Sequence, residues 1–116
     1  LGIVLQPRTR VGDVEVAHRE LPDALVCVDD VLALGAISAF LRKRIRVPQD
    51  ILVTGFDDIR YASVLSPTLT TVHQPLGRIA AEGVRLLADA ESSKIGIQVA
   101  LPGELKIRES TSSGLQ

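Results

Sequence analysis

The sequence predicts an α/β fold in which helices cover a mainly parallel β-sheet. Residues 24–28 and 51–54 are short apolar runs of the kind found in buried parallel strands. Residues 30–44, between them, have the length and composition of a helix. Along the chain the order is strand, helix, strand, strand, helix, strand, which is typical of layered α/β proteins. A right-handed crossover through the first of these helices would make the two strands parallel neighbours.

Each of the two apolar strands ends in a pair of acids. Asp29 and Asp30 directly follow the first strand, and Asp57 and Asp58 follow the second strand after Gly55 allows the backbone to turn. Ligands of open α/β sheets bind at the carboxyl ends of the strands. The two acid pairs therefore predict one polar cleft rather than scattered surface charge.

The N-terminal elements are short. Residues 1–5 are compatible with a strand that Pro7 ends, and residues 12–21 are compatible with a short helix. A turn at Pro22 and Asp23 then leads into the strand at residues 24–28.

The helix expected at residues 30–44 is apolar around nearly its whole circumference. Residues 31–41 contain no charged side chain, and either Asp29 or Asp30 can cap the first turn. The run at residues 42–46, which is basic except for Ile45, suits the C-terminal end of a helix dipole. A helix that is apolar all round is covered on more than one side. We expect the sheet on one side and a homodimer partner on the other, with a neighbouring helix of the same chain as the alternative.

The second half begins with a loop at residues 47–50 and a long connection at residues 59–67. A strand at residues 69–73 and an amphipathic helix at residues 75–90 follow, the latter with Pro75 in its first turn. The polar stripe of this helix alternates in sign, and its other face is expected to be buried. The stripe consists of Arg78, Glu82, Arg85 and Asp89 and the buried face of Leu76, Ile79, Ala80, Gly83, Leu86 and Leu87. Residues 95–101 and 104–109 are predicted as closing strands.

Composition argues against several classes of function. The chain has 116 residues, a net charge of −1, two Phe, one Tyr and no Trp. It has neither a basic patch nor a stacking surface for nucleic acid. The single Cys27, inside an apolar strand, is expected to be a buried, inert thiol without a disulfide or zinc. No apolar run approaches a membrane span. The absence of Met suggests a fragment of a longer protein.

Four motifs together resemble the LacI/GalR family of bacterial transcription regulators. They are PDALVCVDDVLALGA at residues 22–36, VPQDILVTGFDD at 47–58, PTLTTVHQP at 67–75 and LPGELKIREST at 101–111. They occur in the order and near the spacing of the family and cover about residues 22–111. The combination is specific, although each motif alone is only moderately so.

The resemblance implies a three-layer, parallel-sheet lobe of the periplasmic binding protein-like type, here as a partial domain. Residues 1–73 would belong to the C-terminal lobe, residues 74–95 would be the helix that crosses to the N-terminal lobe, and residues 96–111 would be closing strands. The rest of the N-terminal lobe and the DNA-binding domain are expected to be absent from this chain. The helix at residues 75–90 would then lack its usual partner, and should expose its apolar stripe or bind a partner chain.

The family also implies a function and a set of site residues. The chain would be the effector-sensing and dimerisation part of a cytoplasmic LacI-type repressor that binds a small, sugar-like molecule and forms a homodimer. Operator DNA would be bound only through a domain that this chain lacks. The implied ligand-binding residues are Asp29, Phe56, Asp57 and Gln74. The implied dimer contacts are Leu34, Ser38, Tyr61, Val64 and Leu65.

Simpler structural roles compete with these assignments. Asp29 is alternatively only a helix cap, and Asp57 only a cap that orders its loop. Asp29 stands where the family usually has Asn, and an ionised carboxylate only accepts hydrogen bonds. The ligand should therefore offer donors, as a polyol, an amine or a protonated ring nitrogen does. Asp30 is expected to be structural, Asp58 to be a solvated or capping acid, and His73 to be an ordinary hydrogen-bonded histidine.

Two other functions compete with that of a repressor. A periplasmic sugar-binding protein of a transporter has a similar fold, and a signal peptide instead of a helix-turn-helix upstream would identify it. A magnesium-dependent phosphatase could also use acids at neighbouring strand ends, but the sequence has no glycine-rich phosphate loop and no evident nucleophile–base pair. We therefore expect neither an enzyme nor a cofactor.

Overall fold

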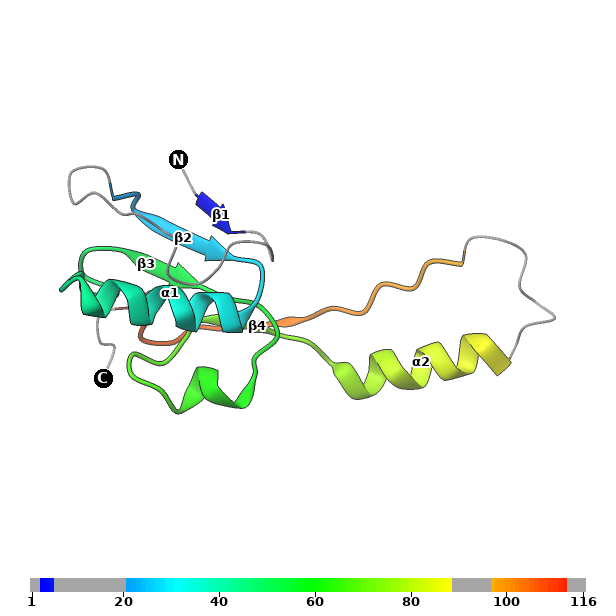
Figure 1. Cartoon of the computed structure of the whole chain (residues 1–116). Coiled ribbons are helices and arrows are strands. Elements are labelled where there is room, and N and C mark those ends of the chain that lie inside the picture. Colours follow the sequence, from blue (N-terminus) through cyan, green and yellow to red (C-terminus); the bar gives the residue numbers. More distant parts are fainter. Residues whose placement is uncertain (1–2, 6–20, 89–96, 113–116) are drawn as a thin grey trace.

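A three-stranded parallel sheet forms the centre of the protein (Figure 1). The computed structural model describes residues 3–5, 21–88 and 97–112. Strands β1 (Ile3–Leu5), β2 (Ala24–Cys27) and β3 (Leu52–Thr54) lie in this order. Leu25 is in register with Ile3 on one side and Val53 on the other. The parallel pairing of β2 with β3, and the strand at the N-terminus, are confirmed.

Helix α1 (Asp30–Arg42) packs against one face of this sheet and completes the core. Leu25 and Cys27 point toward the helix side, because alternate residues of a strand face the same way. The helix contributes the buried residues Leu32, Ala33, Ala36, Ile37 and Phe40. It ends two residues earlier than predicted, since Lys43 donates back to carbonyl groups of the last turn and Arg44 has a left-handed φ of 61°.

The other face of the sheet is only partly covered by the described residues. Val26 and Val28 are 49% and 45% exposed. The helix predicted at residues 12–21 lies outside the described residues except for Leu21. Leu21 packs against the core cluster.

A second, two-stranded sheet continues from the edge of the first. The amide of Gly55 donates to the Thr70 carbonyl at 2.9 Å, so the chain before β4 (Thr71–His73) runs alongside β3. Strand β4 then pairs antiparallel with β5 (Glu104–Lys106). Strands β4 and β5 are both shorter than predicted. Residues 97–101, which were predicted as part of a further strand, are not in a strand. Residues 95 and 96 of that predicted strand are outside the described residues.

Helix α2 (Leu76–Ala88) extends away from the α/β body (Figure 1). None of its residues is buried. Its apolar face is therefore exposed, as expected for a helix without the lobe that would cover it. An apolar groove of about 500 Å³ lies between α2 and the returning residues 97–101. Ile79, Leu86, Ile97 and Val99 are among the residues that line it. The pattern predicted the helix correctly, but burial of its apolar face requires a partner.

Replacement of Phe40 by Ala should destabilise the chain by about 3–5 kcal/mol, because Phe40 is 3% exposed and anchors α1 to the sheet. Val31→Ala is the matched control on the same helix, since Val31 is 65% exposed, and should change the free energy of unfolding by less than about 0.5 kcal/mol. Urea unfolding followed by circular dichroism measures both. Equal effects of the two substitutions would contradict this packing of α1.

Candidate functional site

The loop after β3 is held against the start of α1. The amide of Asp30 donates to the carbonyl of Phe56 at 2.9 Å, and the amide of Asp57 donates to the carbonyl of Val72 at 3.0 Å. These bonds bring the carboxyl ends of β2 and β3 to one edge, as the sequence predicted. Phe56, with 39% of its surface exposed, lies on the same loop.

Asp57 and Gln74 are in direct contact. The Gln74 side-chain amide donates to Oδ1 of Asp57 at 2.5 Å, and both residues are half-buried. Gln74 lies between β4 and α2, so the contact joins the loop after β3 to the segment that leads into the protruding helix. Asp57 also has a positive φ of 112°, which is uncommon for a residue with a side chain. Two residues predicted from separate motifs are thus brought together.

Asp29 is the N-cap of α1. Its Oδ1 accepts from the amide of Leu32 at 2.7 Å, and its backbone is extended. Asp29 therefore has the capping role that was predicted as the alternative to ligand binding. A carboxylate has two oxygens with several acceptor positions, so capping by Oδ1 is compatible with a ligand contact as well.

Asp30 is fully buried and structural, as predicted. Its carboxylate accepts from the amide of Ile59 at 2.8 Å and from the hydroxyl of Thr71 at 2.5 Å. Burial raises the pKa of Asp30, although these two hydrogen bonds oppose the effect. Gly55 permits this arrangement, because a Cβ at that position would overlap the Asp30 carboxylate.

The prediction that Asp58 is a solvated or capping acid is wrong. Its carboxylate binds Nη2 of Arg108 at 2.6 Å and Nδ1 of His73 at 3.1 Å, and its side chain is only 14% exposed. Partial burial raises its pKa, but the hydrogen bonds and charges of Arg108 and His73 outweigh burial and leave the pKa lowered. His73 is the ordinary hydrogen-bonded histidine that was expected.

Arg108 was missed as a partner because it lies 50 residues from Asp58 in the sequence. Its other guanidinium nitrogen, Nη1, donates to the carbonyl of Leu69 at 2.9 Å. The last family motif contains this arginine, and that was the only signal in the sequence that could have drawn attention to it.

Three further observations concern the described residues. Burial, reinforced by the charge of Asp29, raises the pKa of Cys27 to about 12, so its thiol is neutral and inert at physiological pH. Within residues 3–5, 21–88 and 97–112, His, Cys, Asp and Glu side chains form no group of three that could hold a metal ion. In the same part of the chain, no helix is long and apolar enough to span a bilayer.

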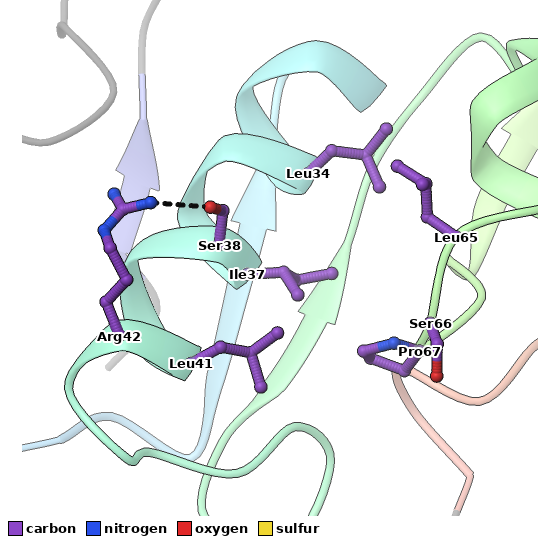
Figure 2. A pocket seen from close by; sticks show the side chains of 8 residues that line it. All are labelled: Leu34, Ile37, Ser38, Leu41, Arg42, Leu65, Ser66 and Pro67. Atoms are coloured by element: carbon purple, nitrogen blue, oxygen red, sulfur yellow. Dashed lines mark hydrogen bonds between the residues drawn. The ribbon is translucent and has the colours of Figure 1, made fainter.

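A second hollow, of about 440 Å³, lies between α1 and the segment after the short 3-10 helix η1 (Arg60–Ser63). Figure 2 shows Leu34, Ile37 and Leu41 of α1 facing this segment, where Leu65 and Pro67 lie. Ser38 lines the same groove and accepts a hydrogen bond from Arg42 at 2.7 Å.

Three of the predicted dimer residues, Leu34, Ser38 and Leu65, therefore share one groove. The other two, Tyr61 and Val64, do not line it, but they are 61% and 62% exposed and belong to η1 and its C-terminal end.

Asp58→Asn should lower the free energy of unfolding at neutral pH by about 1.5–3 kcal/mol, because a partly buried, charge-assisted bond to Arg108 is weakened. The pKa of Asp58 is lower in the folded chain than its ordinary value of 3.8. Its contribution is therefore complete above that value and is lost as the pH falls through the folded-state pKa.

Urea unfolding between pH 7 and pH 3 measures the difference between Asp58→Asn and the unmodified chain. Asp23→Asn, at an exposed position before β2, is the control and should change stability by less than about 0.5 kcal/mol. A difference that persists unchanged at the acidic end would contradict the role of the Asp58 charge.

The chain is similar to known regulators over most of its length. The family model for the periplasmic binding protein-like domain matches residues 5–111. The HTH-type transcriptional repressor PurR of Pasteurella multocida is 43% identical over 102 residues, which cover 86% of this chain and 30% of that protein.

Solved structures agree with the sequence comparison. A LacI regulator from Lactobacillus casei with bound Tris is 35% identical, with a TM-score of 0.70, over 84% of this chain and 34% of that chain. The LacI family transcriptional regulator from the same organism with bound glucose is also 35% identical, with a TM-score of 0.69, over 84% of this chain and 35% of that chain.

The protein spans about 30% of the length of the curated relatives it matches. Those relatives are transcriptional repressors. The fold, the family model and the relatives agree with the four sequence motifs, and the region matched is part of an effector-binding domain. The chain belongs to the family of periplasmic binding protein-like domains, in the form carried by LacI-type transcriptional regulators.

Proposed function

We propose that this chain is the effector-sensing and dimerisation part of a cytoplasmic LacI-type repressor, and that it is not an enzyme. The observation that carries the proposal is the bond between Asp57 and Gln74. It joins the loop at the carboxyl end of β3 to the segment that leads from β4 into α2. A ligand that binds at this point can act on the fold of the lobe and on the path of the chain out of it.

The acceptors at the cleft define the chemistry of the ligand. Asp29 and Asp57 offer carboxylate oxygens, and the half-exposed Phe56 offers an apolar flank. A small molecule with several hydroxyl or amine donors matches this set. The glucose and Tris of the Lactobacillus casei regulator are ligands of this kind. Each charge-assisted hydrogen bond to a buried ligand would contribute about 1.5–3 kcal/mol.

The ligand would act by competing with Gln74 for the Asp57 carboxylate. In the described structure, the Gln74 amide satisfies Oδ1 of Asp57. A ligand hydroxyl that takes this place would free Gln74 to bind the ligand as well, which would close the cleft around it. In the intact repressor, closure would alter the geometry of the DNA-binding domains in the dimer. The ligand changes operator affinity only to the extent that it binds the two conformations differently.

The exposed apolar face of α2 supports the proposed division of the domain. Residues 1–73 would form the C-terminal lobe, residues 74–95 the crossing helix and residues 96–111 the closing strands. Leu76, Val84 and Leu87 are 62%, 67% and 79% exposed. In the intact protein, these side chains would be covered by the rest of the N-terminal lobe.

A periplasmic sugar-binding protein of a transporter is the competing function. The curated relatives, which are repressors, support the regulator. The sequence of the native polypeptide upstream of Leu1 separates the two. A helix-turn-helix there supports the repressor, and a cleaved signal peptide supports the transport receptor.

Asp57→Ala in the intact protein should weaken effector binding by about 10- to 150-fold, because one charge-assisted hydrogen bond of about 1.5–3 kcal/mol is lost. Operator binding without effector should be retained. Isothermal titration with a panel of glucose, sucrose and cellobiose, followed by an operator-binding assay, measures the two properties. Asp50→Ala is the matched control, since Asp50 pairs with Arg46 far from the cleft loop. Loss of operator binding together with effector binding would count against a ligand role for Asp57.

Leu65→Glu should weaken dimerisation of the intact protein by at least about 10-fold, because it places a charge in the apolar groove shared with Leu34. Ser38→Glu, on the opposite wall of the groove, should have the same effect. Gln49→Glu adds the same charge in an exposed loop outside the groove and should leave the dimer intact. Sedimentation velocity over a concentration series gives the dissociation constants. Unchanged dimerisation in both groove variants would show that the subunits meet elsewhere.

A further inference from the structure

We infer that Asp30 and Thr71 form a positioning pair for the loop after β3, residues 55–59, which we call the cleft loop. The pair holds this loop in the conformation that presents Phe56 and Asp57. The inference rests on the proposed function for its consequence, since the loop matters to binding only if Asp57 contacts the effector. The geometry of the pair is independent of the ligand.

Asp30 holds the loop at both of its ends. Its backbone amide donates to the carbonyl of Phe56 at 2.9 Å, on the near side of Asp57. Its carboxylate accepts from the amide of Ile59 at 2.8 Å, on the far side. Asp30 therefore fixes Phe56 and Ile59. The two residues between them are Asp57, the predicted effector-binding residue, and Asp58.

Thr71 holds the middle of the loop. Its hydroxyl donates to the Asp30 carboxylate at 2.5 Å and accepts from the amide of Asp58 at 3.3 Å. The adjacent amide of Asp57 donates to the backbone of the same strand, at the carbonyl of Val72. Three successive loop amides, those of residues 57, 58 and 59, are thus bound by β4 and Asp30. With its backbone fixed in this way, the loop directs the Asp57 carboxylate toward Gln74.

The loop needs such support because its backbone is strained. Asp57 and Asp58 have φ values of 112° and 53°, a region that residues with side chains rarely adopt. Conformations of this kind persist only where surrounding bonds over-determine them. Without the Asp30 and Thr71 bonds, the loop would be free to relax to ordinary φ values, and the Asp57 carboxylate would leave its position beside Gln74.

Both oxygens of the side chain at position 30 take part in the pair. The Asp30 carboxylate receives one donor at each oxygen, Thr71 at Oδ1 and Ile59 at Oδ2. An Asn could keep its oxygen on the Ile59 amide and donate from its NH₂ group to the Thr71 hydroxyl, whereas an Ala removes both contacts. This role is separate from capping of α1, because Asp29 provides the side-chain cap.

Amide hydrogen exchange of the 116-residue chain, measured by NMR, tests the pair directly. In Asp30→Ala, the amides of Asp58 and Ile59 should exchange at least about 10-fold faster, because Ile59 loses its acceptor and the Thr71 hydroxyl that binds the Asp58 amide loses its partner. The amide of Val53, which donates to Ser110 in the core, should keep its protection. Thr71→Val, which replaces the hydroxyl by a methyl group, should also accelerate exchange of these two amides. Thr71→Ser, which keeps a hydroxyl, should leave their exchange slow.

Ile45→Val is the matched control, since Ile45 is fully buried beyond the opposite end of α1. It should leave the exchange of the Asp58 and Ile59 amides unchanged relative to that of Val53. If Asp30→Ala does not fold, the comparison of Thr71→Val with Thr71→Ser decides the question. Unchanged exchange at Asp58 and Ile59, or equal acceleration at Val53, would overturn the inference.

The consequence for binding is tested in the intact protein with glucose and sucrose as probes. Thr71→Val should reduce the affinity for a sugar that the unmodified protein binds by at least fivefold, and Thr71→Ser should recover it. Affinity that is unchanged in Thr71→Val would overturn the link to binding even if exchange is faster. If the unmodified protein binds neither sugar, this counts against the proposed sugar ligand, and the exchange experiment still decides whether the pair positions the loop.

Discussion

The buried carboxylate of Asp30 is the interaction on which the arrangement of the cleft depends. It belongs to α1, and it binds the loop after β3 and the strand β4 at the same time. These three segments are far apart in the sequence, and the loop and β4 are joined in addition by the bond between Asp58 and His73. An acceptor buried this deeply is stabilising only while both donors are present, since an unmatched buried polar group costs about 1–3 kcal/mol. The glycine at position 55 is a second condition, because only a residue without Cβ lets the carboxylate approach.

Much of the fold could be predicted from local patterns. The apolar runs before Asp29 and Gly55 predicted β2 and β3, and the absence of charge at residues 31–41 predicted α1. The same reasoning gathered Asp29 and Asp57 at one edge, because parallel strands end on the same side. These features depend on periodicity and on residues near one another in the chain, which a single sequence displays directly.

The features that were wrong or missed depend on contacts between distant residues. Nothing near Asp58 indicates that Arg108 lies 2.6 Å from it, so the acid was expected to be solvated. The positive φ values of Asp57 and Asp58 were not predicted either. Asp is among the residues that tolerate the left-handed value of Asp58, 53°, but the 112° of Asp57 lies outside that region. The sequence pattern correctly predicted that one face of α2 is apolar. Burial of that face depends on a partner, and among the described residues only 97–101 lie across the groove from it.

The cleft and the proposed dimer surface are joined by a short stretch of chain. Ile59, whose amide binds Asp30, directly precedes η1, and Leu65 of the groove follows η1 by two residues. A change in the loop at Asp57 would therefore move the start of the segment that forms one wall of the groove, while Asp30 begins the helix that forms the other wall. In the proposed repressor, effector binding could reach the subunit interface along this path without a long chain of contacts. The coupling would be reciprocal, so that assembly of the dimer would change effector affinity by the same factor.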